Sequence, residues 1–282
     1  MVGHYPKTLE QALHTLEALE DATVIAGGTD VMVRGAWGEN LVFLNQIGEL
    51  RRIQVRSNEI AIGAGCTFTE LIDTPALPVA LREVFADIAS PAIRNRATIG
   101  GNICNASPVG DSLPALYALG ARVRLARETG GERELPIRAL IHGIGKTALG
   151  RGELLVQVLL PRNRALGVPL WVHQKVAARK AEAISKVSFF GLACTDNGRV
   201  TRFGVAFGAV GVTMVFDAAL EAAVVGLDGA GFRRVRHLLY QRYLEKIHPI
   251  DDQRSTADYR KKVAGHLLWD FLDRLEAQLE GT

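Results

Sequence analysis

The sequence predicts an α+β chain of two domains, and three observations carry that prediction. Its 282 residues and 30.5 kDa exceed the size of most single cores, so each half can bury a core of its own. Apolar runs joined by short turns indicate hairpins, and therefore a mixed rather than an all-parallel topology. The segment 161–169 mixes proline, glycine and charge, as linkers do, and it places the domain boundary after residue 165.

Helical and strand patterns alternate in the first half. Thr8-Leu9-Glu10-Gln11 has the form of a capping box, and leucines at three- and four-residue steps continue it as an amphipathic helix that ends near Asp21. Thr67-Phe68-Thr69-Glu70 opens a second, short helix in the same way. A third helix is expected at 113–119, with Asp111 or Ser112 as its N-cap. Short apolar runs predict strands at 23–26, 41–44, 53–55, 59–63, 121–126 and 153–160.

The second half has strands first and helices afterwards. Strands are expected at 170–177, 186–195 and 200–208. The last two are joined by Asp196-Asn197-Gly198-Arg199, a strong hairpin signal. Helical patterns follow at 213–224, 232–246 and 257–279. This order predicts a sheet that helices cover on one face.

Composition and charge exclude several classes of function. Hydrophobic residues make up 48% of the chain and charged residues 22%, which is ordinary for a globular protein. The net charge is +3, and the short basic clusters 233–236 and 260–262 are interpreted as solvated helix faces, so no nucleic-acid partner is expected. No run approaches the length of a membrane span or a signal peptide, so we expect a cytoplasmic protein.

The cysteines and histidines indicate no metal site. Cys66, Cys104 and Cys194 lie far apart and form no CxxC pair, so neither an iron-sulfur cluster nor a zinc site is predicted on this chain. Cys104 has no base partner in the pattern and is interpreted as a small packing residue rather than a nucleophile. His142, His173 and His248 lie in separate segments without ligand spacing.

Two glycine turns carry the functional signal. One is Ile25-Ala26-Gly27-Gly28-Thr29-Asp30-Val31, and the other lies in the run 97–118, which contains Gly100-Gly101. Glycine lets bare N–H groups approach phosphate oxygens, whereas ionised Asp30 and Asp111 accept hydrogen bonds and suit sugar hydroxyls. Either turn alone could be only a tight turn, but together they could hold the two phosphates of one dinucleotide. Neither is a GxGxxG turn, so a Rossmann site is disfavoured.

These residues resemble a known family. Ala26-Gly27-Gly28-Thr29-Asp30, Ala97-Thr98-Ile99-Gly100-Gly101-Asn102-Ile103 and Ala106-Ser107-Pro108-Val109-Gly110-Asp111 are similar to the FAD-binding subunits of the molybdenum hydroxylases, the xanthine dehydrogenase and carbon monoxide dehydrogenase family. Further matches lie at 145–149, 153–155, 175–186, 249–256 and 259–260, so the resemblance covers nearly the whole chain. It implies an FAD-binding domain of two α+β subdomains (PCMH type) over 1–165. A C-terminal flavoprotein domain over 166–282 follows it.

The resemblance also implies which residues hold the cofactor. Lys175 matches a lysine that approaches the flavin ring and tunes it, and Leu155 matches an aliphatic residue that packs on the ring. No catalytic acid–base residue is implied, because the flavin supplies the chemistry. The complete cofactor-binding set is Ile25, Ala26, Gly27, Gly28, Thr29, Asp30, Val31, Thr98, Gly100, Gly101, Asn102, Cys104, Asn105, Asp111, Leu155 and Lys175.

The function that the resemblance implies is electron transfer within a larger enzyme. FAD would receive electrons from the 2Fe-2S clusters of a partner subunit and pass them to NAD+ or another acceptor, while a third subunit holds molybdopterin and oxidises the substrate. Two alternatives stay open at this point. The chain could be a stand-alone flavin oxidoreductase with its own organic substrate, or a structural subunit whose turns bind no flavin.

Overall fold

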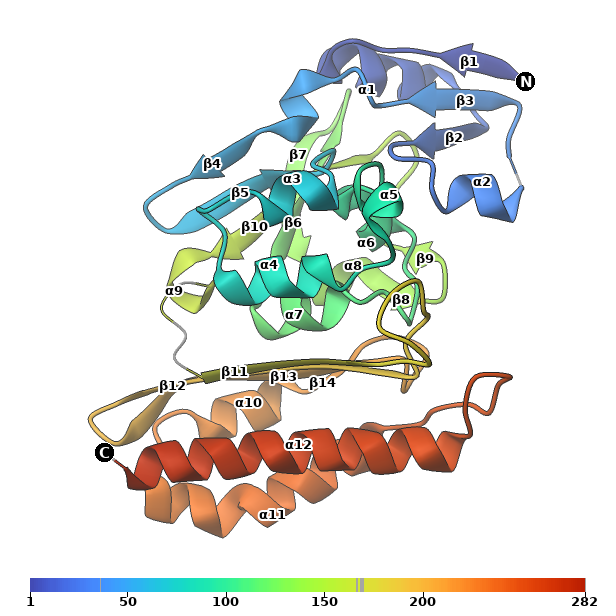
Figure 1. Cartoon of the computed structure of the whole chain (residues 1–282). Coiled ribbons are helices and arrows are strands. Elements are labelled where there is room, and N and C mark those ends of the chain that lie inside the picture. The colour runs from blue at the N-terminus through green and yellow to red at the C-terminus, as the bar shows by residue number, and fades with distance from the viewer. Residues whose placement is uncertain (36, 166, 168–169, 282) are drawn as a thin grey trace. The chain divides into compact units, whose positions relative to one another are not determined.

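A computed structural model describes residues 1–35, 37–165, 167 and 170–281, and these residues form two compact units (Figure 1). The first unit comprises Met1–Ser107 and Gly120–Arg162, and the second comprises Pro108–Leu119 and Asn163–Thr282. The linker expected at 161–169 includes residues 166, 168 and 169, which lie outside the described residues. The domain boundary after residue 165 stays a prediction.

The first unit contains a three-stranded parallel sheet and a five-stranded antiparallel sheet. In spatial order the parallel sheet consists of β1 (Val2–His4), β3 (Asn40–Phe43) and β2 (Ala22–Ile25). The antiparallel sheet consists, again in spatial order, of β4 (Ile53–Val55), β5 (Glu59–Gly63), β10 (Leu154–Pro161), β6 (Arg122–Arg127) and β7 (Gly131–Pro136). A small hairpin pairs β8 (Ile141–Gly143) with β9 (Lys146–Thr147).

Most helices of the first unit are short. They are α1 (Leu9–Ala18), α2 (Val31–Arg34), the 3-10 turn η1 (Gly48–Arg51), α3 (Phe68–Ile72), α4 (Val79–Ala86), α5 (Pro91–Arg94), α6 (Ile99–Cys104) and α8 (Ile137–Leu140); α9 (Arg162–Ala165) follows β10. One hydrophobic cluster joins α1 to both sheets through Ala12, Leu16, Val42 and Val156. The amphipathic helix that the leucine spacing predicts is therefore confirmed, because α1 buries one face against the sheets.

The two expected capping boxes differ in detail. At α3 the box is complete, since the Thr67 hydroxyl accepts from Glu70 N and Thr67 N donates to the Glu70 carboxylate at 2.8 Å. At α1 the Thr8 hydroxyl accepts from Gln11 N as expected, but the Gln11 side chain accepts from Lys7 N instead of Thr8 N. The helix start is correct, and the reciprocal bond is displaced by one residue.

The second unit is built on a four-stranded antiparallel sheet of β11 (Leu170–Val176), β12 (Val187–Asp196), β13 (Arg199–Gly208) and β14 (Val215–Phe216). The hairpin predicted between β12 and β13 is present. Asn197 and Gly198 both have left-handed backbone, with φ of 48° and 69°, as the tight primed hairpin turn requires.

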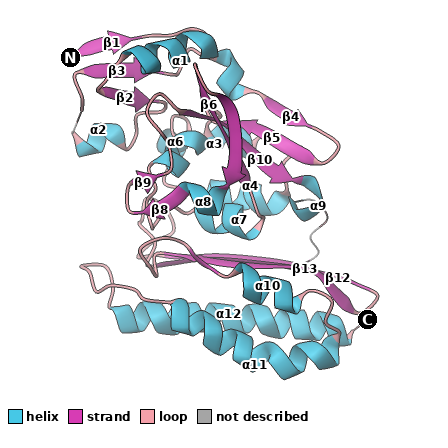
Figure 2. Cartoon of the chain, turned by 180° about the vertical axis from the view of Figure 1, so that it is seen from behind, coloured by secondary structure: helices cyan, strands magenta, loops and turns pink. Residues whose placement is uncertain are grey.

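Helices cover both faces of this sheet (Figure 2). The long helices α11 (Gly229–Lys246) and α12 (Ala257–Glu280) and the shorter α10 (Ala218–Val224) form the expected layer, where Phe271 packs on Gly191 of β12. The other face receives α7 (Leu113–Ala118), whose Ala118 carbonyl lies 2.6 Å from the position that a Cβ on Gly204 would occupy. The prediction of helices on one face of this sheet was therefore incomplete, because α7 comes from far earlier in the chain.

One expected helix is wrong at its start. The pattern 213–224 predicts a single helix, but Val215 and Phe216 instead form β14 on the edge of β13. β-Branched and aromatic residues favour strands, and the edge of β13 offers main-chain groups to pair with. The helix begins only after Asp217, whose carboxylate caps it by accepting from Ala219 N and Leu220 N.

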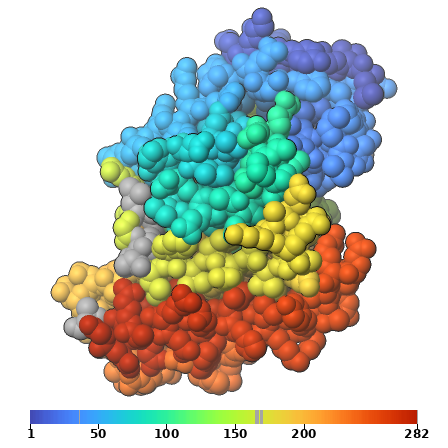
Figure 3. Space-filling view, in the orientation of Figure 1, coloured from blue at the N-terminus to red at the C-terminus, as the bar shows by residue number. Residues whose placement is uncertain are grey.

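The outer helix α12, red in Figure 3, forms part of the molecular surface on the face that this view shows. Its inner side buries Leu268, Phe271, Leu272 and Leu275 in the core of the second unit.

None of the helices in the described segments is both long and apolar enough to cross a membrane.

Candidate functional site

The first glycine turn leaves β2 and enters α2. Gly28 has a φ of +77°, which side-chain-bearing residues rarely adopt. A Cβ on Gly27 would lie 1.9 Å from the carbonyl oxygen of Arg96, so only glycine allows the two main chains to approach this closely. Because Arg96 lies just before the second turn, this contact brings the two turns together.

The second glycine turn is held by hydrogen bonds to the loop between β5 and α3. Gly100 N donates to the Ala64 carbonyl at 2.9 Å, and Ile99 N donates to the Cys66 carbonyl at 3.0 Å. The hydroxyl of Thr98 caps α6 by accepting from Gly101 N at 3.1 Å. A Cβ on Gly100 would lie 2.7 Å from Ala64, which explains the glycine at this position.

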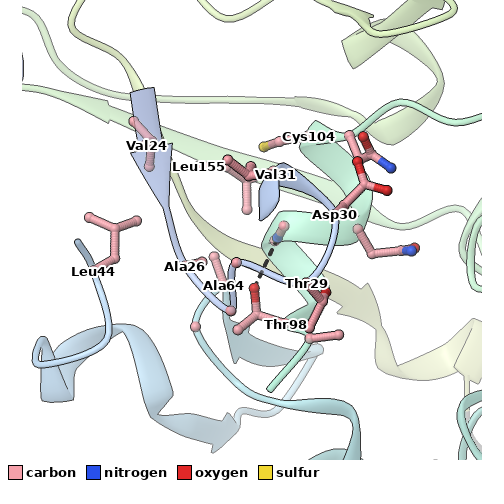
Figure 4. A pocket seen from close by; sticks show the side chains of 18 of the residues that line it. Val24, Ala26, Thr29, Asp30, Val31, Leu44, Ala64, Thr98, Cys104 and Leu155 are labelled. Atoms are coloured by element: carbon pink, nitrogen blue, oxygen red, sulfur yellow. Dashed lines mark hydrogen bonds between the residues drawn. The ribbon is translucent and has the colours of Figure 1, made fainter. Parts of the chain in front are cut away.

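Both turns line one cavity of about 440 Å³, a size typical of small-molecule sites (Figure 4). In the figure Thr29, Asp30 and Thr98 belong to the turns, whereas Val24 and Leu155 come from strands. The predicted residues that line the cavity are Ala26, Gly27, Gly28, Thr29, Asp30, Val31, Thr98, Gly100, Gly101, Asn102, Cys104, Asn105 and Leu155. Three predicted residues, Ile25, Asp111 and Lys175, are not among its lining.

Several lining residues lie outside the predicted cofactor-binding set. The apolar wall, which comprises Val24, Leu44, Leu50, Phe68, Ile88, Ile93 and Leu154, has the pattern of ordinary core residues. Arg34 and Glu153 also line the cavity. Arg34 could have been found, because it follows Asp30 by four residues and so shares its side of a helical turn. The apolar residues become a wall only through the tertiary fold.

The two turns differ in the hydrogen-bond donors that they offer. Within the described part of the chain, the main-chain N–H groups of residues 27–30 donate no hydrogen bond to the protein. In the second turn, Ile99 N, Gly100 N, Gly101 N and Asn102 N are all engaged by protein oxygens. The expectation that both turns present bare N–H groups therefore holds for the first turn and not for residues 99–102. There the amides hold the second turn in place.

Charged side chains at the cavity occur as pairs. The Arg34 guanidinium lies 2.9 Å from the Asp30 carboxylate and also donates to the side-chain oxygen of Asn105. Glu153 accepts two bonds from Arg133, at 2.6 and 2.7 Å, and this hydrogen bonding lowers the pKa of Glu153. Glu153 therefore stays ionised beside the cavity, with its charge offset by Arg133.

Cys104 lines the cavity as a neutral thiol. Burial raises its pKa to about 12, because desolvation disfavours the thiolate. A thiol in this state is a poor nucleophile.

Asp111 and Lys175 lie in the second unit and contact each other. The Lys175 ammonium is 2.8 Å from the Asp111 carboxylate, and the two side chains are only 5% and 9% exposed. The hydroxyl of Ser185, which is fully buried, donates to the other carboxylate oxygen of Asp111. Buried charges need such partners, so these three residues stabilise one another. Their part in cofactor binding, like that of Ile25, stays a prediction.

The described residues contain no group of three or more His, Cys, Asp or Glu side chains arranged to hold a metal ion.

Comparison with known proteins identifies the family. Residues 3–163 match the FAD binding domain in molybdopterin dehydrogenase, and residues 173–275 match the CO dehydrogenase flavoprotein C-terminal domain. The nicotinate dehydrogenase FAD-subunit of Eubacterium barkeri is 31% identical over 96% of both chains, and the carbon monoxide dehydrogenase medium chain of Afipia carboxidovorans is 31% identical over 98% of this chain and 96% of that one.

A solved carbon monoxide dehydrogenase structure from Hydrogenophaga pseudoflava, which lacks the Mo-pyranopterin moiety of the molybdenum cofactor, has the same fold. It matches with a TM-score of 0.85 and 26% identity over 96% of this chain and 95% of that chain. The chain is therefore an oxidoreductase subunit with an FAD-binding domain, and it belongs to the family of FAD-binding subunits of the molybdenum hydroxylases.

Proposed function

We propose that FAD is bound in the cavity between the two glycine turns. The observation that carries this proposal is that residues 26–31 and 98–105, about seventy positions apart, line a single cavity. The donor set fits the cofactor. Open N–H groups at 27–30 suit phosphate oxygens, the Asp30 carboxylate suits a sugar hydroxyl, and the apolar wall suits aromatic rings.

When bound, FAD supplies the exchange of electrons and hydride, and the protein supplies binding, orientation and exclusion of water. The first turn would hold the phosphates. Val24, Leu44 and Leu155 would exclude water from the rings.

We further propose that the chain is the electron-transfer subunit of a larger cytoplasmic enzyme. Iron-sulfur clusters of one partner would deliver electrons to FAD, and NAD+ or another acceptor would take them up. A molybdopterin-binding partner would oxidise the organic substrate. Support comes from the relatives, which are named as the FAD-subunit of one dehydrogenase and the medium chain of another. Such names describe parts of larger enzymes.

Reconstitution tests the cofactor and acceptor together. The purified chain is incubated with FAD, freed of excess by gel filtration and assayed for bound flavin by absorbance. It is then given NADH with ferricyanide as the terminal oxidant. We expect close to one flavin per chain and NADH oxidation that depends on that flavin. A colourless chain would contradict FAD binding, and a yellow chain that is inert to NADH would exclude NAD+ as the acceptor.

Co-purification tests the proposed partners. The chain is tagged and isolated under native conditions from the cells that make it. We expect an iron-sulfur chain and a molybdenum-containing chain in fixed proportion to it, and reduction of its flavin when the substrate of the complex is added. A chain that purifies alone and turns over a small organic molecule by itself would instead identify a stand-alone flavin oxidoreductase.

A further inference from the structure

Arg34 has an unusual position at the cavity. Among the described residues that line it, Arg34 has the only positively charged side chain. It is the last residue of α2, and its side chain is 54% exposed. Its guanidinium reaches both turns, because Asp30 belongs to the first and Asn105 follows α6 at the end of the second.

Among the described lining residues, Arg34 is the one whose charge can attract a further anion. The lining includes two carboxylates, on Asp30 and Glu153. The negative charge of Glu153 is offset by the guanidinium of Arg133, which donates two short hydrogen bonds to this carboxylate. Arg133 itself does not line the cavity. Arg34 therefore offsets the charge of the Asp30 carboxylate. A diphosphate that enters the cavity would add negative charge beside this carboxylate, and the Arg34 guanidinium would attract it.

The donors of the second turn lead to the same residue. Ile99 N, Gly100 N and Gly101 N are satisfied by protein oxygens, so an anion on this side of the cavity must be bound by side chains. A guanidinium presents several N–H groups in one plane and matches phosphate oxygens in pairs. Because the Arg34 side chain is half exposed, it can turn towards a ligand without leaving a buried partner unsatisfied.

We propose that Arg34 binds the diphosphate of FAD, keeping its contact with Asp30 and exchanging its contact with Asn105 for a phosphate oxygen. This inference rests on the proposed function, in which FAD occupies the cavity. It assigns the cationic part of phosphate recognition to a side chain, beside the main-chain donors of the first turn.

The test compares Arg34→Gln, Arg34→Lys and the matched control Arg122→Gln, which removes a half-exposed arginine paired with Glu134 between β6 and β7. The affinity of each full-length chain for FAD is measured by flavin fluorescence at several NaCl concentrations. We expect Arg34→Gln to weaken binding about 10- to 100-fold and to flatten the salt dependence, since a charged hydrogen bond is lost. Arg34→Lys should recover part of the affinity, and the control should bind like the wild type.

A purely structural role for Arg34 gives a different result. If Arg34 only ties Asp30 to Asn105, Arg34→Gln lowers the unfolding temperature of the FAD-free chain and leaves the salt dependence of binding unchanged. That result, or wild-type affinity in Arg34→Gln, would overturn the inference while the proposed function stands. If the wild-type chain binds no FAD at any salt concentration, both the proposed function and the inference fail.

Discussion

At the scale of single residues, the site depends on positions where the absence of a side chain is the functional property. Gly27 is the clearest of these, because its main chain lies against the main chain at Arg96 and Ala97. Main-chain atoms cannot rotate away as a flexible side chain can. Gly28 adds a left-handed backbone that lets the chain turn from β2 into α2.

Gly27→Ala should therefore disrupt the contact between the two turns. The added Cβ would meet the Arg96 carbonyl oxygen at 1.9 Å, so we expect a loss of about 1–3 kcal/mol in the free energy of unfolding, together with loss of bound flavin. Gly48→Ala is the matched control, because its Cβ would meet nothing within 4 Å. Urea unfolding and flavin absorbance measure both effects. Equal stability and flavin content in the two variants would contradict the role of Gly27.

The three thiols should react slowly in the folded chain. Burial raises the pKa of Cys66 and of Cys104 to about 12 and also raises the pKa of Cys194. At pH 8 few thiolates form, so we expect labelling by iodoacetamide to be far slower in the native chain than in the urea-unfolded chain. Mass spectrometry assigns the rates. FAD should slow the labelling of Cys104 further and leave Cys194 unchanged; a native Cys104 that reacts at the unfolded rate would show that its thiol is not buried.

At the scale of elements, single polar side chains hold loops against the helices and strands that they join. The loop before α12 is an example. Asp252 accepts from Arg254 N at 2.8 Å and Ser255 N at 3.1 Å, and it pairs with the Arg260 guanidinium at 2.7 Å. The Arg260 side chain is 3% exposed and donates to the Ala209 carbonyl, so this one carboxylate ties the loop to the body of the second unit.

This arrangement predicts a pH dependence with a definite sign. Main-chain hydrogen bonding, with help from Arg260, lowers the pKa of Asp252 from 3.8 to about 2. A lowered pKa stabilises the folded state above the unfolded value, and that contribution disappears as the pH falls from about 4 towards 2. Asp252→Asn should therefore be less stable than the wild type at pH 7, and the difference should shrink over that acid range.

Denaturant unfolding at a series of pH values measures this difference. Asp258→Asn is the control, because Asp258 makes an exposed pair with Lys262 on the same helix. A difference between Asp252→Asn and wild type that stays constant from pH 7 to pH 2 would show that Asp252 contributes nothing through its ionisation.

At the scale of the whole molecule, each of the two units buries a hydrophobic core of its own among the described residues. In the first unit, aliphatic residues of α1 pack against both sheets, and Phe68 and Phe85 form a fully buried aromatic pair. The core of the second unit contains Phe189, Phe207 and Phe271, whose ring centroids lie 4.9–5.9 Å apart in contacting pairs. Among the described residues, all those that line the cavity belong to the first unit.

Binding of FAD should raise the free energy of unfolding of the chain by mass action, because the cavity exists only in the folded state. With free FAD at one hundred times its dissociation constant, we expect a gain of about 2.7 kcal/mol, because the ligand binds only the folded state. Scanning calorimetry with and without FAD measures the shift. Gly27→Ala should show a much smaller shift than the wild type, and a wild-type chain whose unfolding is unmoved by FAD would contradict binding in the cavity.

The sequence by itself determined many of the strands, the hairpin at Asn197-Gly198, the starts of α1, α3, α7 and α12, and the two glycine turns. These follow from local chemistry, namely caps, turn residues and apolar periodicity, which act within a few neighbouring residues. Only the tertiary structure decided that Gly27 contacts Arg96 and that α7 covers one face of the sheet of the second unit. It likewise decided that Val24 and Leu44 line the cavity and that Arg34 contacts residues of both turns. It also decided that the amides of the second turn are already bonded to Ala64 and Cys66. Such contacts join positions distant in the chain, and no local pattern specifies which distant carbonyl an amide will meet.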